Sequence, residues 1–165
     1  MKIVVTAASK HGSTAQIADV IGEQLTAAGH DVNVRDPDAV RDLDGIDAVV
    51  LGSAVYAGRW LGPARELVTR LGPELADRPV WMFSSGPVGD PAKPKEEAVD
   101  VAAASAATGA REHRIFAGHL DRDELGLGER AMVRAFRATA GDFRDWEKIT
   151  GWAQDIDAEL RNSRP

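Results

Sequence analysis

Short apolar runs alternate with amphipathic segments along this chain. Residues 3–6 form a β-branched, uncharged run, and residues 80–84 and, apart from Asp47, residues 46–51 are also mostly apolar. Such runs are typical of strands that are buried on both faces of a parallel sheet. Residues 14–25 instead carry apolar side chains at helical spacing, and Gly29 ends this segment. The pattern therefore predicts buried strands and amphipathic helices that follow one another in turn.

The remaining segments continue this alternation. We expect two more strands, over residues 32–34 and 114–120, and further helices over residues 63–76, 95–108, 129–140 and 146–160. Parallel strands need crossover helices on the faces of their sheet. The expected fold is therefore an α/β three-layer sandwich with a five-stranded parallel sheet. No repeat or long linker interrupts residues 1–165, so we expect one domain.

Composition narrows the possible functions. A length of 165 residues fits one domain, and 44% hydrophobic with 28% charged residues is typical of a globular protein. The formal net charge of -6 repels a polyphosphate backbone, so we expect no nucleic-acid partner. The absence of cysteine excludes disulfides, thiolate nucleophiles and cysteine-bound metal clusters. A redox function would therefore need a bound organic cofactor.

The sequence predicts a cytoplasmic location. No run approaches the roughly 20 apolar residues that span a bilayer, and the first residues are too few for a signal-peptide core. In the helix expected over residues 129–140, Arg130, Arg134 and Arg137 line one face and apolar side chains line another. Because basic amphipathic helices can lie on membranes, we expect at most peripheral membrane contact.

Three residues near the last helix have structural interpretations. Asp145 is expected to cap the helix, and Trp146 and Trp152 are expected to pack on the sheet. No histidine metal site is expected, because no two histidines have the spacing of neighbours on a helix.

The first connection after a buried strand contains the residue types of an anion site. Ligands of open α/β sheets bind beyond the carboxyl ends of the strands, where this connection lies. Backbone N–H groups at the start of the next helix, nearby hydroxyls and a lysine would bind a phosphate group. Alternatively, the hydroxyls only cap the helix. The candidate phosphate contacts are Ser9, Lys10, His11, Gly12, Ser13 and Thr14.

Two further connections at the same edge suit a flat ring. The second holds the only tyrosine and a tryptophan, which could stack on a heteroaromatic ring or pack on the following helix. The third is rich in Gly and Pro, so its backbone groups could pair with a ring edge, unless it is a plain turn. The candidates in the second connection are Ala54, Val55, Tyr56, Ala57, Gly58 and Trp60. Those in the third are Ser84, Ser85, Gly86, Pro87 and Gly89.

A phosphate site, an aromatic wall and exposed backbone at one sheet edge suit a mononucleotide with a redox-active ring. Residues 9–14 resemble the phosphate loop of the flavodoxin-like superfamily, Ser/Thr-x-Thr-Gly-x-Thr, except that His11 replaces a hydroxyl residue. Residues 52–58 and 145–147 also resemble, in the same order, the flavodoxin-domain family that includes the menaquinone-dependent protoporphyrinogen IX dehydrogenases. This resemblance implies non-covalent FMN with its isoalloxazine ring between the second and third connections. Its phosphate would lie on Ser9, Gly12, Ser13 and Thr14.

The resemblance implies a flavin-dependent oxidoreductase that passes reducing equivalents to a quinone-like or protein acceptor. The flavin would carry the chemistry, so we expect cofactor-binding residues and no catalytic ones. One alternative is an electron carrier that docks on a redox partner protein and has no substrate; another is a scaffold without a ligand. A third is the same fold with a deazaflavin coenzyme, whose acidic tail would suit Lys10, His11 and Arg59. The segment before the last helix is shorter than in the dehydrogenases, which leaves a porphyrinogen substrate open.

Overall fold

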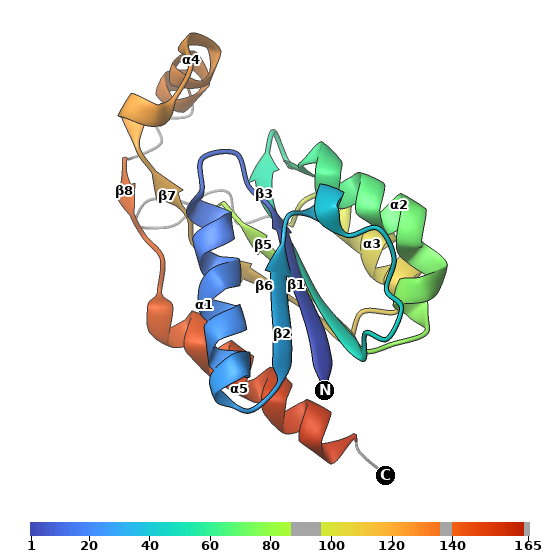
Figure 1. Cartoon of the computed structure of the whole chain (residues 1–165). Helices are drawn as coiled ribbons and strands as arrows, with labels where there is room; N and C mark the ends of the chain where they lie inside the picture. The colour runs from blue at the N-terminus through green and yellow to red at the C-terminus, as the bar shows by residue number, and fades with distance from the viewer. Residues whose placement is uncertain (87–96, 136–139, 164–165) are drawn as a thin grey trace.

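The computed structural model describes residues 1–86, 97–135 and 140–163. Its centre is a parallel sheet with the strand order β2-β1-β3-β5-β6, which confirms the predicted five-stranded α/β fold (Figure 1). β1, β3 and β5 lie inside the sheet and are buried along most of their length, whereas β2 is an exposed edge. The strands are β1 (Lys2–Ala8), β2 (Asp31–Arg35), β3 (Ala48–Tyr56), β5 (Val80–Ser85) and β6 (Glu112–Phe116).

Helices cover both faces of the sheet, α1 and α5 on one side and α2 and α3 on the other (Figure 1). Successive residues of a strand point to opposite faces. Ile3 and Val5 of β1 therefore pack in the core with α1 and α5, whereas Val4 packs in the core with α2 and α3. The four helices are α1 (Ser13–Ala27), α2 (Gly62–Ala76), α3 (Val101–Thr108) and α5 (Trp146–Asn162).

The third strand is longer than predicted. Its apolar run ends at Leu51, but β3 continues through Gly52 to Tyr56 and returns as the short antiparallel strand β4 (Arg59–Trp60). A Cβ atom at Gly52 would lie 2.1 Å from the Phe83 ring. This position therefore needs glycine, because the ring packs directly against the backbone here. Most of the second connection is therefore strand rather than loop, and the prediction was wrong there.

The strand predicted over residues 114–120 is divided. β6 ends at Phe116, and β7 (His119–Leu120) leaves the sheet to pair with β8 (Gly141–Asp142) in a separate antiparallel ribbon. Between these strands, η2 (Arg122–Glu124) and α4 (Leu127–Ala135) form what we call the α4 arm, residues 121–135. Figure 1 shows α4 beyond the end of this ribbon, away from the body of the sheet.

The expectations for the last helix are confirmed in part. Asp145 caps α5, since its carboxylate accepts a hydrogen bond from the Lys148 N–H at 3.1 Å. Trp152 is buried in the core, but Trp146 is exposed and lies against the Arg144 guanidinium, 4.6 Å from its centre to the ring centroid. Trp146 therefore does not pack on the sheet.

Within the described residues, one helix begins later than predicted and a further short helix was not predicted. The helix predicted from residue 95 begins at Val101, although residues 95 and 96 lie outside those ranges. A short helix, η1 (Pro37–Ala39), follows β2. Among the helices that the structure describes, none is both long and apolar enough to cross a membrane. The described residues include no cluster of side chains suited to a metal ion.

Candidate functional site

Three predicted segments meet at the carboxyl edge of the sheet. The phosphate loop, residues 9–14, joins β1 to α1, and the hairpin tip, residues 56–58, joins β3 to β4. Gly86 follows β5 at the same edge, because β1, β3 and β5 are parallel neighbours. The candidates Pro87 and Gly89 lie outside the described residues.

The start of α1 has open backbone donors. Gly12 is the N-cap, with φ 82° and ψ -18°, a left-handed conformation that favours glycine. No described side chain accepts a hydrogen bond from the first-turn N–H groups, so the hydroxyls do not cap this helix. The Ser13 hydroxyl instead accepts a hydrogen bond from the His119 N–H at 3.2 Å, and Thr14 is buried. The free N–H groups therefore suit an anion such as a phosphate group.

A carboxylate from the α4 arm contacts two side chains of the phosphate loop. Glu129 accepts a hydrogen bond from the Lys10 ammonium and lies 3.1 Å from Nε2 of His11. Its second oxygen accepts the N–H of Gly126 at 2.9 Å. The hydrogen bond from Lys10, followed by those from Gly126 and His11, lowers the pKa of Glu129 to about 2. No local pattern in the sequence predicts this contact, because Glu129 lies 119 residues from Lys10.

Tyr56 borders the same group. The Lys10 ammonium lies 5.1 Å from the Tyr56 ring centroid, and the His11 ring lies 6.5 Å from it. Burial, with a further contribution from the negative charge of Glu129, raises the pKa of the Tyr56 hydroxyl. We call Lys10, His11, Tyr56 and Glu129 the loop cluster. It brings the phosphate loop, the hairpin tip and the α4 arm together.

The hairpin tip is strained. Ala57 and Gly58 have φ angles of 49° and 73°, the signs that a tight type I′ turn requires at both central residues. Glycine adopts this conformation without cost, but alanine pays about 1–2 kcal/mol for it. Val99 and Asp100, ahead of α3, hold the tip, because the Val99 N–H donates to the Gly58 carbonyl and Asp100 accepts the Trp60 N–H, both at 2.9 Å. Such strain is often maintained at binding sites.

Trp60 and Ser84 are not available to a ligand ring. Trp60 is only 2% exposed, and its indole N–H donates to the Ser84 hydroxyl at 2.7 Å. The same hydroxyl lies 2.8 Å from Nε2 of His113, whose Nδ1 lies 2.7 Å from a Glu97 oxygen. We call Trp60, Ser84, His113 and Glu97 the sheet cluster. The predicted aromatic wall at Trp60 was therefore wrong, because its ring packs in the core with α2 and α3.

The remaining candidates provide backbone rather than side chains. Ala54 and Ser85 are buried within β3 and β5. A Cβ atom at Gly86 would lie 3.4 Å from Cβ of Val55, and one at Gly118 would lie 3.4 Å from Cα of Gly86. These distances are ordinary van der Waals contacts, so β3, the end of β5 and the segment after β6 pack side by side at this edge.

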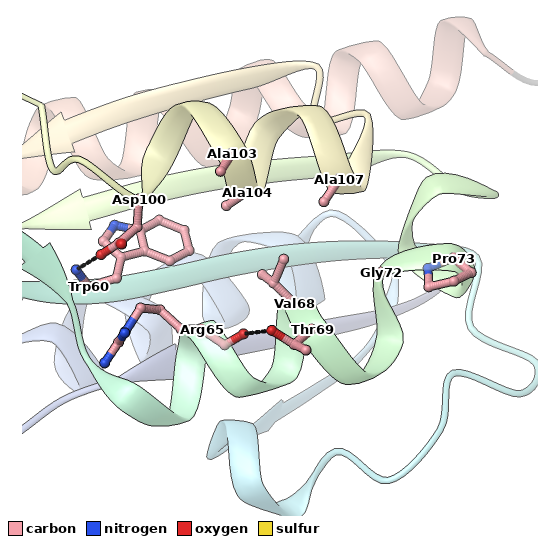
Figure 2. A pocket seen from close by; sticks show the side chains of 10 residues that line it. All are labelled: Trp60, Arg65, Val68, Thr69, Gly72, Pro73, Asp100, Ala103, Ala104 and Ala107. Carbon is pink, nitrogen blue, oxygen red and sulfur yellow. Dashed lines mark hydrogen bonds between the residues drawn. The ribbon is translucent and has the colours of Figure 1, made fainter.

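A groove of about 600 Å³ lies elsewhere, between α2 and α3. Figure 2 shows Trp60 and Asp100 at one end and Gly72 and Pro73 at the other. Its walls are mostly small or apolar side chains, and Arg65 is the one cation among the described residues that line it. The strand edge combines open backbone donors with the Lys10 and His11 side chains, so it suits an anionic ligand better than the groove does.

The base of the β7–β8 ribbon is attached to α1. Arg144 donates to the Gln16 side chain at 2.5 Å and to the Ser13 carbonyl at 3.4 Å. It also pairs with Asp142 of β8 at 2.6 Å, and its side chain is only 6% exposed. The hydrogen bond from Arg144 lowers the pKa of Asp142 to about 2. The β7–β8 ribbon therefore has a fixed position beside the phosphate loop.

This fold and edge define a class of protein. An open parallel sheet in this strand order, with its ligand loop after the first strand, is the flavodoxin arrangement. The sequence matches the family model described as a flavodoxin domain over residues 4–146. The chain therefore belongs to the flavodoxin domain family. No curated protein matches the sequence.

Solved structures share the fold. The chain is similar to a flavodoxin from the domain Archaea, with 17% identity, a TM-score of 0.69 and coverage of 98% of this chain and 99% of that chain. Flavodoxin 2 from Bacillus cereus is 24% identical, with a TM-score of 0.66 and coverage of 97% and 99%. Rubredoxin oxygen:oxidoreductase from Desulfovibrio gigas is 15% identical, with a TM-score of 0.69 and coverage of 98% of this chain and 36% of that chain.

Proposed function

We propose that this protein binds FMN non-covalently and carries electrons to a redox partner protein. The observation that supports this most is the uncapped start of α1, where Gly12 leaves the first-turn N–H groups open beside Lys10 and His11. This donor set fits one phosphate monoester. FMN, when bound, supplies the redox chemistry.

The paired charges of the site favour FMN over a deazaflavin with an acidic tail. Lys10 and His11 lie on Glu129, and the Arg59 guanidinium pairs with Asp100 at 3.5 Å. A tail of several carboxylates would need these cations, and it would be repelled by the two acidic partners. A single phosphate can use the backbone donors of α1 instead.

The residues of the site have distinct binding roles in this proposal. The phosphate loop holds the phosphate through backbone N–H groups, with Lys10 as the nearby positive charge. The partly buried phenol of Tyr56 offers a planar face to the isoalloxazine ring. The Gly86 N–H donates to the Phe116 carbonyl and the Gly58 carbonyl accepts from the Val99 N–H, so the polar edge of the ring would pair with the other backbone groups of the hairpin tip and with the Gly86 carbonyl. No side chain has to act as a nucleophile or as a proton donor.

The kind of electron acceptor would distinguish an electron carrier from an enzyme. The negative net charge and the similarity to flavodoxins support a protein acceptor. A quinone-like acceptor, as in the protoporphyrinogen dehydrogenases, stays a prediction from the sequence resemblance. Reduced protein should transfer electrons to a small redox protein in stopped-flow mixing. Faster, saturable oxidation by a soluble quinone would identify an enzyme instead.

Two glycine variants test FMN binding. Gly12 and Gly29 flank α1, both have positive φ angles, and a Cβ atom at either would meet nothing within 4 Å. Gly12→Ala and Gly29→Ala should therefore cost similar stability, about 1–2 kcal/mol each. Only Gly12→Ala should weaken FMN binding, by about tenfold if one or two of the loop hydrogen bonds are lost. Flavin fluorescence titration measures the FMN affinity of both variants. Wild-type protein that does not bind FMN would refute the proposal.

A further inference from the structure

The carboxylate of Glu129 occupies the part of the phosphate loop that an anionic ligand would use. It contacts the side chains of Lys10 and His11, the two cationic candidates of that loop. A carboxylate can only accept hydrogen bonds, so Nε2 of His11 must carry the proton between them. Glu129 therefore already provides a negative charge where a phosphate would bring another.

This contact is also the attachment of α4 to the loop. In the parts of the chain that the structure describes, hydrogen bonds from α4 side chains to the body are made by Glu129 alone. Leu127, at the start of α4, is 88% exposed, and Arg130 and Arg134 are exposed as well. Figure 1 shows α4 projecting from the ribbon rather than packing on the sheet. Leu125, just before α4, is buried and holds the start of the arm, so loss of the Glu129 contact would release α4 itself and leave Leu125 in place.

We propose that Glu129 is a built-in competitor for the ligand phosphate, which displaces its carboxylate from Lys10 and His11 and so frees α4 from the phosphate loop. This inference rests on the proposed phosphate site. A phosphate monoester carries about -1.5 to -2 charge and three acceptor oxygens, against one charge and two oxygens for a carboxylate. The phosphate can also use the N–H groups of α1, which Glu129 does not reach. Phosphate is therefore the stronger ligand of the loop, and Glu129 lowers its apparent affinity.

The first experiment compares FMN with riboflavin, which lacks the phosphate. Glu129→Gln should bind FMN about fivefold more tightly than wild type, the effect of removing one partly screened like charge. Its riboflavin affinity should not change. Glu124→Gln, which removes a nearby exposed carboxylate of η2, is the matched control and should change neither. Weaker FMN binding, or an equal gain for both flavins, would overturn the proposal.

The second experiment follows the arm itself by hydrogen exchange of α4 amides. FMN or inorganic phosphate should speed exchange in residues 127–135 of wild type, and Glu129→Gln should exchange as fast without ligand. If wild type binds neither FMN nor riboflavin, the proposed function fails. Inorganic phosphate then tests the Glu129 inference independently of the flavins. Amide shifts in the phosphate loop should then show about fivefold tighter phosphate binding by Glu129→Gln. Equal affinities, no phosphate binding, or unchanged α4 exchange would contradict the inference.

Discussion

The loop cluster and the sheet cluster place similar groups in different surroundings. Each joins a glutamate to a histidine and includes an aromatic ring. In the loop cluster, the Lys10 side chain is 47% exposed, and the carboxylate comes from an arm that projects from the body. In the sheet cluster, Trp60 and Ser84 are buried between neighbouring strands and the helices above them.

Burial decides what each cluster can do. A buried polar group that loses its partner keeps the full cost of its desolvation, so Trp60, Ser84 and His113 have one stable arrangement. Glu97 is the exception in the sheet cluster, because its side chain is 52% exposed. Ion pairs near the surface contribute little, because water can replace either partner. The loop cluster can therefore exchange partners with a ligand, while the sheet cluster holds the hairpin that borders the same site.

The largest expected effect comes from Trp60→Ala. This substitution removes a large buried ring and leaves Ser84 without its indole donor. We expect a loss of about 3–5 kcal/mol in the free energy of unfolding, measured by urea denaturation. Trp60→Phe keeps most of the ring and should lose less. A midpoint that hardly moves in Trp60→Ala would remove the distinction between the clusters.

Ser84→Ala should have an intermediate effect. It leaves the Trp60 N–H and the His113 ring nitrogen without their shared partner. Urea denaturation should show a loss of about 1–3 kcal/mol, with little change in FMN affinity. Thr69→Ala is a control, because its exposed hydroxyl bonds only to the α2 backbone; it should cost less than about 0.5 kcal/mol. A large loss of FMN affinity with unchanged stability would reverse our assignment of Ser84.

Lys10→Met should lower FMN affinity more than it lowers the stability of the fold. Its partly exposed ion pair with Glu129 should contribute no more than about 1 kcal/mol to stability. FMN affinity, in contrast, should fall about fivefold or more, because the phosphate loses its nearest cation. Lys2→Met removes the same charge at the amino end of β1 and should leave FMN binding unchanged. Equal affinities of the two variants would show that Lys10 does not serve the ligand.

The smallest effect concerns pH. The pKa of Glu129 in the folded protein is about 2, below its usual value of 4.5, so its contacts stabilise the fold above pH 4.5. This contribution should be lost as the pH falls from 4.5 through 2. Carboxyl ¹³C NMR should give a midpoint near 2 in wild type and a higher one in Lys10→Met. An unshifted midpoint in wild type would mean that Glu129 is not held on the loop.

Local sequence patterns predicted most of the sheet and its helices. The uncharged runs at β1 and β5 are buried on both faces, and residues 14–25 lie within α1. These predictions succeed because burial on both sides of a sheet demands apolar side chains over several consecutive residues. The position of the phosphate loop follows from the same pattern, since it begins where a buried strand ends.

Contacts between distant segments account for what the sequence analysis missed. Gly52 and Ser53 look like turn residues, yet β3 passes through both. Gly52 makes room for the Phe83 ring, and the buried Ser53 hydroxyl bonds the Ala54 carbonyl and the Leu61 N–H. The sequence alone did not decide whether Trp60 stacks on a ligand ring or packs on the following helix, because the hairpin determines which way its ring points. Glu129 reaches the phosphate loop through a ribbon that leaves the sheet, which no local pattern encodes.

The β7–β8 ribbon has a consequence for protein engineering. Leu120 and Gly141 are paired opposite each other, and Arg144 fastens the base of the ribbon to α1. A tight two-residue turn such as Asn-Gly could therefore join these positions directly and replace residues 121–140. The shortened chain would keep the ribbon and the open start of α1. A reporter or a docking module could also be inserted between Leu120 and Gly141, where it would lie beside the phosphate loop.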